Sequence, residues 1–404
     1  MSTTATPAHV LVSGAGIAGL ALALQLVRRG IRTTVVERAE SPRPGGQAVD
    51  LRGASREVAE RLGLLPLIDP LRLHEKGLSY VDARGRVFGR MSMEDFDGKG
   101  AVAEIEIARG DLADVLRREL AAADHDGLLD LRYGDLIASI QQDADGVDVG
   151  FVHSPALRVD AVVAADGVHS ATRRLVFGPE ERFRTYLGGY AVFFTMPTPD
   201  DVEEGWFSMR FTPGITFGIR PDLDPATSKA MLTLRMPHDP ALRGDTEAQR
   251  ALVRRALDGA GWHASTIVAA MDEATDFYFD ELVSIDVPHP AQGRVALLGD
   301  AASSGSPMSG MGTATAMIGA YLLASRLAEG SDVPEALERY ARDLRPFAEQ
   351  GRRLMGGGIH RMVPATRLET ALLRVSMGVM LSRPMRPLVR RMFAASHEEL
   401  PLPV

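Results

Sequence analysis

The sequence predicts an α/β protein in which a mostly parallel sheet is interrupted by an antiparallel sheet and followed by a helical C-terminal segment. Residues 9–37 have the pattern of a strand, a helix and a second strand, which is the repeating unit of a parallel sheet. Two further apolar runs, "RVDAVVAADG" and "RVALLGDAA", lead into a turn of glycine and aspartate. Between them, residues 180–285 hold short aromatic-rich runs separated by turns, which is typical of antiparallel strands.

The composition is that of an ordinary globular protein and excludes several functions. Of 404 residues, 45% are hydrophobic and 24% are charged, and the formal net charge of −8 argues against a nucleic-acid partner. The absence of cysteine excludes disulfides and thiolate catalysis, and we expect no metal site. The N-terminus lacks a signal-peptide pattern and no apolar run reaches the ~18 residues of a membrane helix, so we expect a cytoplasmic protein.

The stretch "GAGIAG", between the first strand and helix, predicts a Rossmann-like dinucleotide site. Gly14 allows the tight turn, Gly16 lets a pyrophosphate approach the backbone, and Gly19 lets helix and strand pack closely. Amides at the helix N-terminus then face the phosphates. Glu37 ends the second strand, where a carboxylate accepts hydrogen bonds from ribose hydroxyls and repels a 2′-phosphate. The resident ligand is therefore expected to be FAD or NAD rather than NADP.

A second motif, "VVAADGVHSATRR", places Asp166 and Gly167 directly after a strand. A third, "GDAASSGSPMSGMGTATA", begins at residue 299 and holds four glycines and four serines. Together with "GAGIAG", these segments resemble the three signatures of the para-hydroxybenzoate-hydroxylase-like flavoprotein monooxygenases. In that family the second signature serves both FAD and the nicotinamide donor.

The resemblance assigns the third motif to the flavin ring. It implies that Asp300 contacts the ribityl chain of FAD, that Pro307 lies in a loop along the isoalloxazine, and that Gly310 and Gly312 precede a helix beneath the pyrimidine ring. Reduced flavin carries negative charge on that side, which a helix N-terminus stabilises.

The third motif departs from the family pattern, whose "GQGxN" is here "GMGTA", and it also departs at three single positions. The family has histidine in place of Ser303, a first proline in place of Ser306, and a helical aspartate in place of Gly319. We expect these changes to preserve the backbone geometry and FAD binding while removing side chains near the flavin. Whether they alter or abolish oxygen transfer stays open.

Two further segments add cofactor residues. Arg109 precedes a predicted helix, where the helix dipole disfavours a cation unless an anion is present, and "RGDLADVLRREL" resembles the family helix whose arginine contacts the flavin cofactor. Residues 43–65 resemble the tetracycline-inactivating flavin monooxygenases, which implies that Gly46 passes the flavin, Asp50 contacts FAD and Arg43 helps to bind NADPH. The full set of predicted cofactor residues is Gly14, Gly16, Ala18, Gly19, Glu37, Arg38, Arg43, Gly46, Gln47, Asp50, Arg109, Leu136, Asp166, Gly167, Asp300, Pro307, Gly310 and Gly312.

The resemblance implies a single-component monooxygenase with bound FAD and transient NADPH or NADH. Such an enzyme forms a flavin hydroperoxide from O2 and inserts one oxygen atom into an aromatic or polycyclic small molecule, such as a polyketide or an antibiotic. We expect no catalytic side chain, because the cofactor carries this chemistry. Two alternatives stay open: a flavoprotein reductase or oxidase, and a cyclase in which FAD is structural. Hydroxylation, epoxidation and Baeyer–Villiger insertion are not distinguished.

The aromatic middle sheet is expected to bind the substrate. The candidate walls are Phe193, Met209, Phe211 and Phe217, with Arg210 and Arg220 as polar anchors, although each could equally belong to an ordinary sheet core or surface. The expected FAD-binding domain comprises residues 1–75, 101–178 and 286–343; substrate-domain strands fall in 76–100 and 179–285, and a C-terminal helical segment in 344–404. We expect a monomer or homodimer. Net acidity argues against membrane contact by the arginine-rich C-terminal segment.

Overall fold

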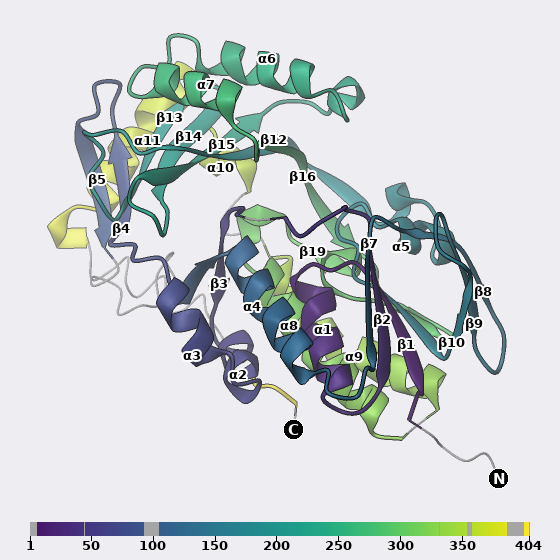
Figure 1. The fold of residues 1–404 in the computed structure, drawn as a ribbon. Coiled ribbons are helices and arrows are strands. Elements are labelled where there is room, and N and C mark those ends of the chain that lie inside the picture. The colour runs from purple at the N-terminus through teal and green to yellow at the C-terminus, as the bar shows by residue number, and fades with distance from the viewer. Residues whose placement is uncertain are drawn as a thin grey trace.

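The computed structural model describes residues 6–43, 45–92, 105–330, 332–353, 358–385 and 400–403. Parts of the expected domain segments, residues 93–104, 354–357 and 386–399, lie outside the described residues. Two large sheets organise the chain and lie apart in Figure 1, with helices packed against each. No helix in the described ranges is both long and apolar enough to cross a lipid bilayer.

The first sheet is built on the strand–helix–strand unit that the sequence predicts. Its six strands run in the order β17-β18-β11-β1-β2-β7, and all neighbours are parallel except β17 and β18. The bounds of these strands are β1 (His9–Ser13), β2 (Arg32–Glu37), β7 (Leu129–Tyr133), β11 (Ala161–Ala164), β17 (Ala291–Gln292) and β18 (Val295–Leu297). Parallel strands buried on both faces explain the continuous apolar runs of the sequence.

Helices cover one face of this sheet, and their apolar side chains form the main core. The helices are α1 (Ile17–Val27), α4 (Arg109–Ala123), α8 (Gly312–Ala328) and α9 (Val333–Gly351). A small sheet packs its apolar side chains on the opposite face; it consists of β8 (Ile137–Gln142), β9 (Val147–Phe151) and β10 (Leu157–Val159). The expected boundary between residues 343 and 344 falls inside α9, so one helix spans it.

The second sheet has eight strands in the order β19-β16-β12-β15-β14-β13-β4-β5. Their neighbours are antiparallel as predicted, except that β13 and β4 are parallel. In that order the strands are β19 (Ser303–Ser304), β16 (Tyr278–Asp286), β12 (Arg184–Pro197), β15 (Thr227–Arg235), β14 (Ile215–Pro221), β13 (Trp206–Thr212), β4 (Gly77–Val81) and β5 (Val87–Ser92). Because β19 belongs to the third motif, its pairing with β16 connects that motif directly to the second sheet.

Two helices, α6 (Thr246–Leu257) and α7 (Ala264–Glu273), cover one face of the second sheet. Figure 1 shows them on the face that is turned away from the first sheet. The other face is therefore turned toward the segments that carry the cofactor motifs. The remaining elements are β3 (Ala48–Leu51), which pairs with β6 (Ile105–Ala108), and the helices α2 (Ala54–Arg61), α3 (Leu65–Ile68), α5 (Ala171–Val176), α10 (Ile359–Met362) and α11 (Arg367–Met380).

Candidate functional site

The turn between β1 and α1 and the first turn of α1 contain three glycines. At two of them the backbone leaves no room for a Cβ, and at the third it leaves open space. Gly14 has a φ of +108°, and a Cβ on it would lie 2.4 Å from the carbonyl oxygen of Ala165. A Cβ on Gly19 would lie 1.9 Å from the carbonyl oxygen of Gly14. On Gly16, by contrast, a Cβ would meet only a guanidinium nitrogen of Arg109, at 3.6 Å. The backbone at Gly16 is thus open to a ligand, as a bound pyrophosphate requires.

The backbone amides at the N-terminus of α1 receive no hydrogen bond acceptor from a capping side chain. No side chain caps the helix, and its first turn, which includes Ala18, contains no acidic residue. The free amides suit an anion. Beside them, Glu37 accepts hydrogen bonds from the amides of Ala15 and Ala39 through its two oxygens, both at 2.9 Å. These bonds fix the carboxylate at the turn, and each oxygen keeps a further acceptor position for a ribose hydroxyl.

Arg109 lies between the two glycine segments predicted to approach the cofactor. Arg109 is the first residue of α4 and is half-buried. A Cβ on Gly46 would lie 3.5 Å from the Cβ of Arg109. Its amide donates to the carbonyl of Gln47 at 3.0 Å, which fixes the loop that contains Gly46. Within the described ranges, no hydrogen bond or ion pair engages its guanidinium. A half-buried cation at a helix N-terminus, with no direct ion pair in the described ranges, fits a diphosphate.

The third motif brings Asp50 and Asp300 to the start of α8. A Cβ on Gly310 would lie 3.8 Å from Oδ2 of Asp50, and a Cβ on Gly312 would lie 3.6 Å from Oδ1 of Asp300. No side chain caps α8. Burial raises the pKa of Asp300, although the positive charge of Arg109 opposes that shift. Residues predicted from three distant segments therefore meet beside an uncapped helix N-terminus, and together they fit FAD.

The loop before α8 contradicts the expectation of a preserved backbone. Ser306 has a φ of +67°, whereas proline, the family residue, is restricted to about −65°. Its buried hydroxyl has no hydrogen-bond partner within the described ranges. The next residue, Pro307, is exposed. The loop therefore follows a different path at this position.

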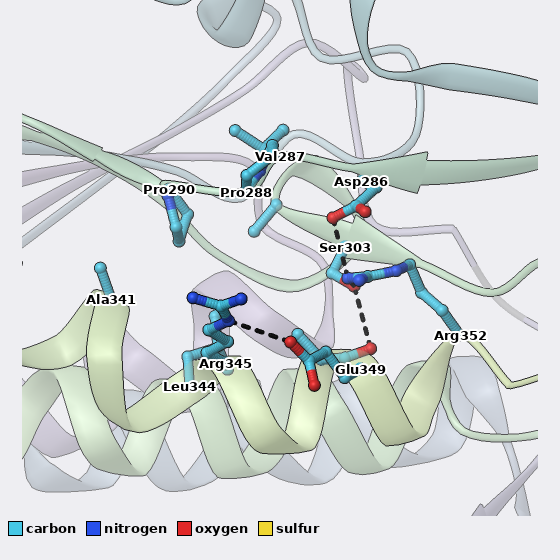
Figure 2. Close-up of a pocket in the computed structure, with 12 residues that line it drawn as sticks. Asp286, Val287, Pro288, Pro290, Ser303, Ala341, Leu344, Arg345, Glu349 and Arg352 are labelled. Atoms are coloured by element: carbon cyan, nitrogen blue, oxygen red, sulfur yellow. Dashed lines mark hydrogen bonds and ion pairs between the residues drawn. The ribbon is translucent and has the colours of Figure 1, made fainter.

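Ser303 points toward the C-terminal end of α9. Its hydroxyl accepts a hydrogen bond from Nη1 of Arg352 at 2.9 Å, and Arg352 also pairs with Asp286 at 3.0 Å. Figure 2 shows this triad in a pocket of about 120 Å³ between β16 and α9. The polar side chains of this pocket hydrogen-bond or pair with one another.

Gly319 is in the protein core rather than near the flavin segment. A Cβ on it would lie 2.9 Å from Cδ1 of Leu298, 3.3 Å from Cδ1 of Leu344 and 3.6 Å from the hydroxyl of Tyr340. The expectation that this position removes a side chain near the flavin is therefore wrong. Position 319 is glycine because α8 packs closely on α9 there and leaves little room for a side chain.

The second motif is a structural junction. The carboxylate of Asp166 accepts from the amide and hydroxyl of Thr172, at 3.0 and 2.9 Å, and Gly167 has a φ of +84°. Arg173, which is fully buried, donates to the carbonyl of Ala301 at 3.0 Å and pairs with Glu180 at 3.2 Å. The motif thus holds the backbone next to Asp300.

Within the described ranges, no hydrogen bond or ion pair joins three of the predicted cofactor residues to Arg109, Asp50 or Asp300. Arg38 and Arg43 are exposed. Leu136 is half-buried in the turn after β7, where the preceding amide, of Asp135, donates to the carbonyl of Glu37 at 3.1 Å. Leu136 is therefore next in sequence to a residue that bonds the backbone of Glu37, whose carboxylate is predicted to bind the ribose.

A chain of polar side chains that the sequence did not reveal begins at Tyr278. Its hydroxyl donates to Oδ2 of Asp280 at 2.9 Å, and Oδ1 of Asp280 lies 3.1 Å from Nε2 of His169. Nδ1 of His169 lies 3.1 Å from Glu180, and Asp280 and Glu180 together raise the pKa of His169 to about 9. This chain connects the second motif to β16.

Tyr278 also lies close to the predicted flavin residues. The side chain is 43% exposed, but desolvation of its hydroxyl raises the pKa of the phenol; the charges of Asp280 and Asp300 raise it further, and Arg109 opposes them. Its ring stacks on Phe193, with centroids 5.8 Å apart. Only the register between β12 and β16 places these residues together, and a single sequence does not show that register.

Strand alternation divides the predicted substrate residues between two faces of the second sheet. Phe217 is fully buried in the core beneath α6 and α7, and Arg210, on the same face, donates to the carbonyl of Ala260 at 2.6 Å. These two residues are not brought to the cofactor side. The other face carries Phe193, Met209, Phe211 and Arg220.

Arg220 is engaged within the protein instead of being free to anchor a substrate. It pairs with Glu75 and, at 2.9 Å, with Glu106, and both glutamates are buried. Burial raises the pKa of Glu106 to about 8, although the charge of Arg220 opposes the shift. Lys229, on the same face, pairs with Asp222 at 3.0 Å. Neither cation is left for an anionic substrate.

No group of three histidine, aspartate or glutamate side chains in the described part of the chain is arranged to hold a metal ion. The candidate site consists of a glycine turn, two uncapped helix N-termini, Arg109, which forms no ion pair in the described ranges, and an aromatic sheet face. These parts come from separate regions of the chain that the two sheets bring together (Figure 1).

Comparison with known proteins gives consistent matches over most of the chain. A family model described as "FAD binding domain" matches residues 7–353. An uncharacterized protein of Mycobacterium tuberculosis (strain ATCC 25618 / H37Rv) is 37% identical over 87% of this chain and 93% of its own. A flavin-dependent monooxygenase from an unknown prokaryotic organism is 34% identical over 84% of this chain and 86% of its own. The crystal structure of tetracycline destructase Tet(55) is 29% identical, with a TM-score of 0.78 over 100% of both chains.

Proposed function

The chain belongs to the FAD-binding family of flavin-dependent monooxygenases and is a FAD-dependent enzyme, and we propose that its substrate is an aromatic or polycyclic small molecule. We further propose NADPH or NADH as the electron donor. The observation that supports the substrate class is the aromatic face of the second sheet. Phe193, Met209, Phe211 and Tyr278 lie on the side turned toward the cofactor segments.

The cofactor would be held from both of its ends by residues of this chain. The amides at Gly16 and Ala18, with the guanidinium of Arg109, would bind the pyrophosphate, and Glu37 would accept from the ribose. Asp300 would meet the ribityl chain, and the N-terminus of α8 would lie at the pyrimidine side of the ring. Bound FAD supplies electron transfer from the nicotinamide and activation of O2.

The substrate face favours a neutral planar molecule. In the described ranges its cations Arg220, Lys229 and Arg235 are paired with carboxylates, so that none of the three is available for a substrate carboxylate. The ring of Tyr278, which is 43% exposed and stacks on Phe193, offers a stacking surface, and its phenol is held by Asp280. A substrate hydroxyl can hydrogen-bond to the Tyr278 oxygen, which has acceptor capacity while its proton is donated to Asp280. Tyr278 would thereby orient a phenolic substrate, and it could accept the substrate's proton only by passing its own proton to Asp280.

Product mass after reaction under 18O2 tests this proposal. The FAD-loaded protein is incubated with NADPH and, in separate reactions, with tetracycline, 1,8-dihydroxyanthraquinone and, as an anionic probe, salicylate. We expect one 18O atom in the product of a neutral polycyclic probe and none with salicylate. A product with altered hydrogen content and no label would favour a reductase or oxidase. An isomer of unchanged mass would favour a cyclase with structural FAD.

A further inference from the structure

Helix α11 carries an aliphatic stripe on its solvent side. The exposed fractions are 70% for Leu368, 61% for Leu372, 67% for Val375 and 55% for Val379. Their spacing of four, three and four residues places them on one face of the helix. The opposite face contacts β5 and β13, where the carbonyl of Met377 lies 3.8 Å from a Cβ built on Gly89. The stripe is therefore directed away from the protein.

Such a stripe is unusual for this molecule. Six of the twelve large hydrophobic residues exposed in the described ranges fall within residues 362–380. Single exposed aliphatic residues are common on proteins, whereas a contiguous group of them marks a binding surface. We therefore expect the stripe to be covered by a binding partner.

Positive charge beside the stripe identifies the kind of partner. Arg367 is exposed at the start of α11, and Arg361 is exposed on the preceding α10. Arg374 is directed to the protein side, where its guanidinium lies over the ring of Phe88, 5.2 Å from the ring centroid. The acid of α11, Glu369, is already engaged. It accepts from the amide of Ala365 at 2.6 Å and pairs with Arg235 at 3.5 Å. An apolar face with arginines along its edge complements an anionic lipid surface.

We propose that α11 docks on membranes rich in anionic lipid, with the stripe among the acyl chains and Arg361 and Arg367 at the phosphate level. The helix has 14 residues and is about 21 Å long, shorter than the ~30 Å hydrocarbon core, so it lies along the surface. The proposal is independent of the proposed substrate, and it replaces the expectation from net charge that this segment avoids membranes. It would bring the enzyme to where apolar polycyclic compounds accumulate.

Co-sedimentation of the full-length, FAD-loaded protein with vesicles tests the proposal. Vesicles are made of phosphatidylcholine with or without phosphatidylglycerol. We expect binding to the anionic vesicles that weakens with added salt. The double variant Leu372→Glu/Val375→Glu should lose about tenfold or more in binding, and Arg361→Gln/Arg367→Gln about fivefold per arginine.

Matched control variants show whether vesicle binding depends on the stripe of α11. Val152→Glu and Leu175→Glu change aliphatic side chains that are 50% and 47% exposed elsewhere, and these variants should bind as the wild type does. All variants should keep their FAD content. The proposal is overturned if the wild type stays in the supernatant with both vesicles, or if the stripe variants bind normally. A dimer in light scattering that Leu372→Glu/Val375→Glu dissociates, without vesicle binding, would instead assign the stripe to a second copy of the chain.

Discussion

Arg109 is a half-buried guanidinium that forms no ion pair in the described ranges, although Asp300 lies near enough to feel its charge, and it stands at a helix end where a cation is disfavoured. We therefore expect Arg109→Gln to lower the affinity for FAD roughly 10- to 100-fold, because charge-assisted hydrogen bonds contribute about 1.5–3 kcal/mol. Quenching of flavin fluorescence on titration of the apoprotein measures this affinity. Arg118→Gln, an exposed change on the same helix, is the matched control. Equal FAD affinity in the two variants would contradict the assigned role.

Tyr278 is the side chain through which this protein would act on a phenolic substrate. Tyr278→Phe keeps the ring that stacks on Phe193 and removes the hydroxyl bound to Asp280. We expect product formation from 1,8-dihydroxyanthraquinone to fall roughly a hundredfold, which is typical for loss of a proton-transferring group. Single-turnover kinetics would measure it. Unchanged oxygenation in a variant with normal FAD content would remove Tyr278 from the mechanism.

His169 makes stability depend on pH in a definite direction. Hydrogen bonds to Asp280 and Glu180 raise its pKa in the folded state to about 9, above the value of about 6.5 in an unfolded chain. Its stabilising effect is therefore complete below pH about 6.5 and is lost as pH rises through about 9. We expect His169→Gln to cost about 1–2 kcal/mol at low pH, allowing for partial exposure, and little at high pH. Urea unfolding across this range measures both, and a pH-independent difference would contradict the account.

At the scale of elements, the packing of α8 on α9 explains why residue 319 is glycine. Gly319→Asp would bury an unpaired carboxylate among Leu298, Leu344 and Tyr340, and we expect a loss of about 3 kcal/mol or more in the free energy of unfolding. Gly319→Ala should change it by about 1 kcal/mol or less. The gain in helix propensity offsets a contact with the flexible end of Leu298. Urea denaturation compares the two variants, and a stable Gly319→Asp protein would show that α8 and α9 pack differently.

Motifs local to one turn could be predicted from the sequence. The turn of Gly14 and Gly19 is set by steric limits within a few residues, and the fold class follows from the strand–helix–strand pattern. The proximity of Asp50, Asp300 and Arg109 was implied by family resemblance rather than by any local pattern.

Contacts between strands could not be predicted in the same way. The chain from Tyr278 to His169 depends on the register of β16 against β12, and the pairing of Arg220 depends on two glutamates from distant segments. One error was avoidable, because Met209 and Arg210 are neighbours on a strand and must face opposite sides. The positive φ of Ser306 has no signal in the sequence.

At the scale of the whole molecule, the two sheets place a cofactor turn and an aromatic face on opposite sides of one site (Figure 1). β19, which follows Asp300 closely, pairs with β16, which carries Tyr278, so the flavin motif and the substrate face form one connected structure. Enzymes of this arrangement require electrons to reach the flavin before oxygen is used.

Anaerobic reduction of the bound FAD tests the central claim most directly. NADPH or NADH is added to the FAD-loaded protein without O2, and the visible flavin band is followed with and without tetracycline or 1,8-dihydroxyanthraquinone. We expect the band to bleach with at least one of the two donors, and to bleach faster in the presence of a neutral polycyclic probe. A flavin that binds but is reduced by neither donor under any of these conditions would contradict the account.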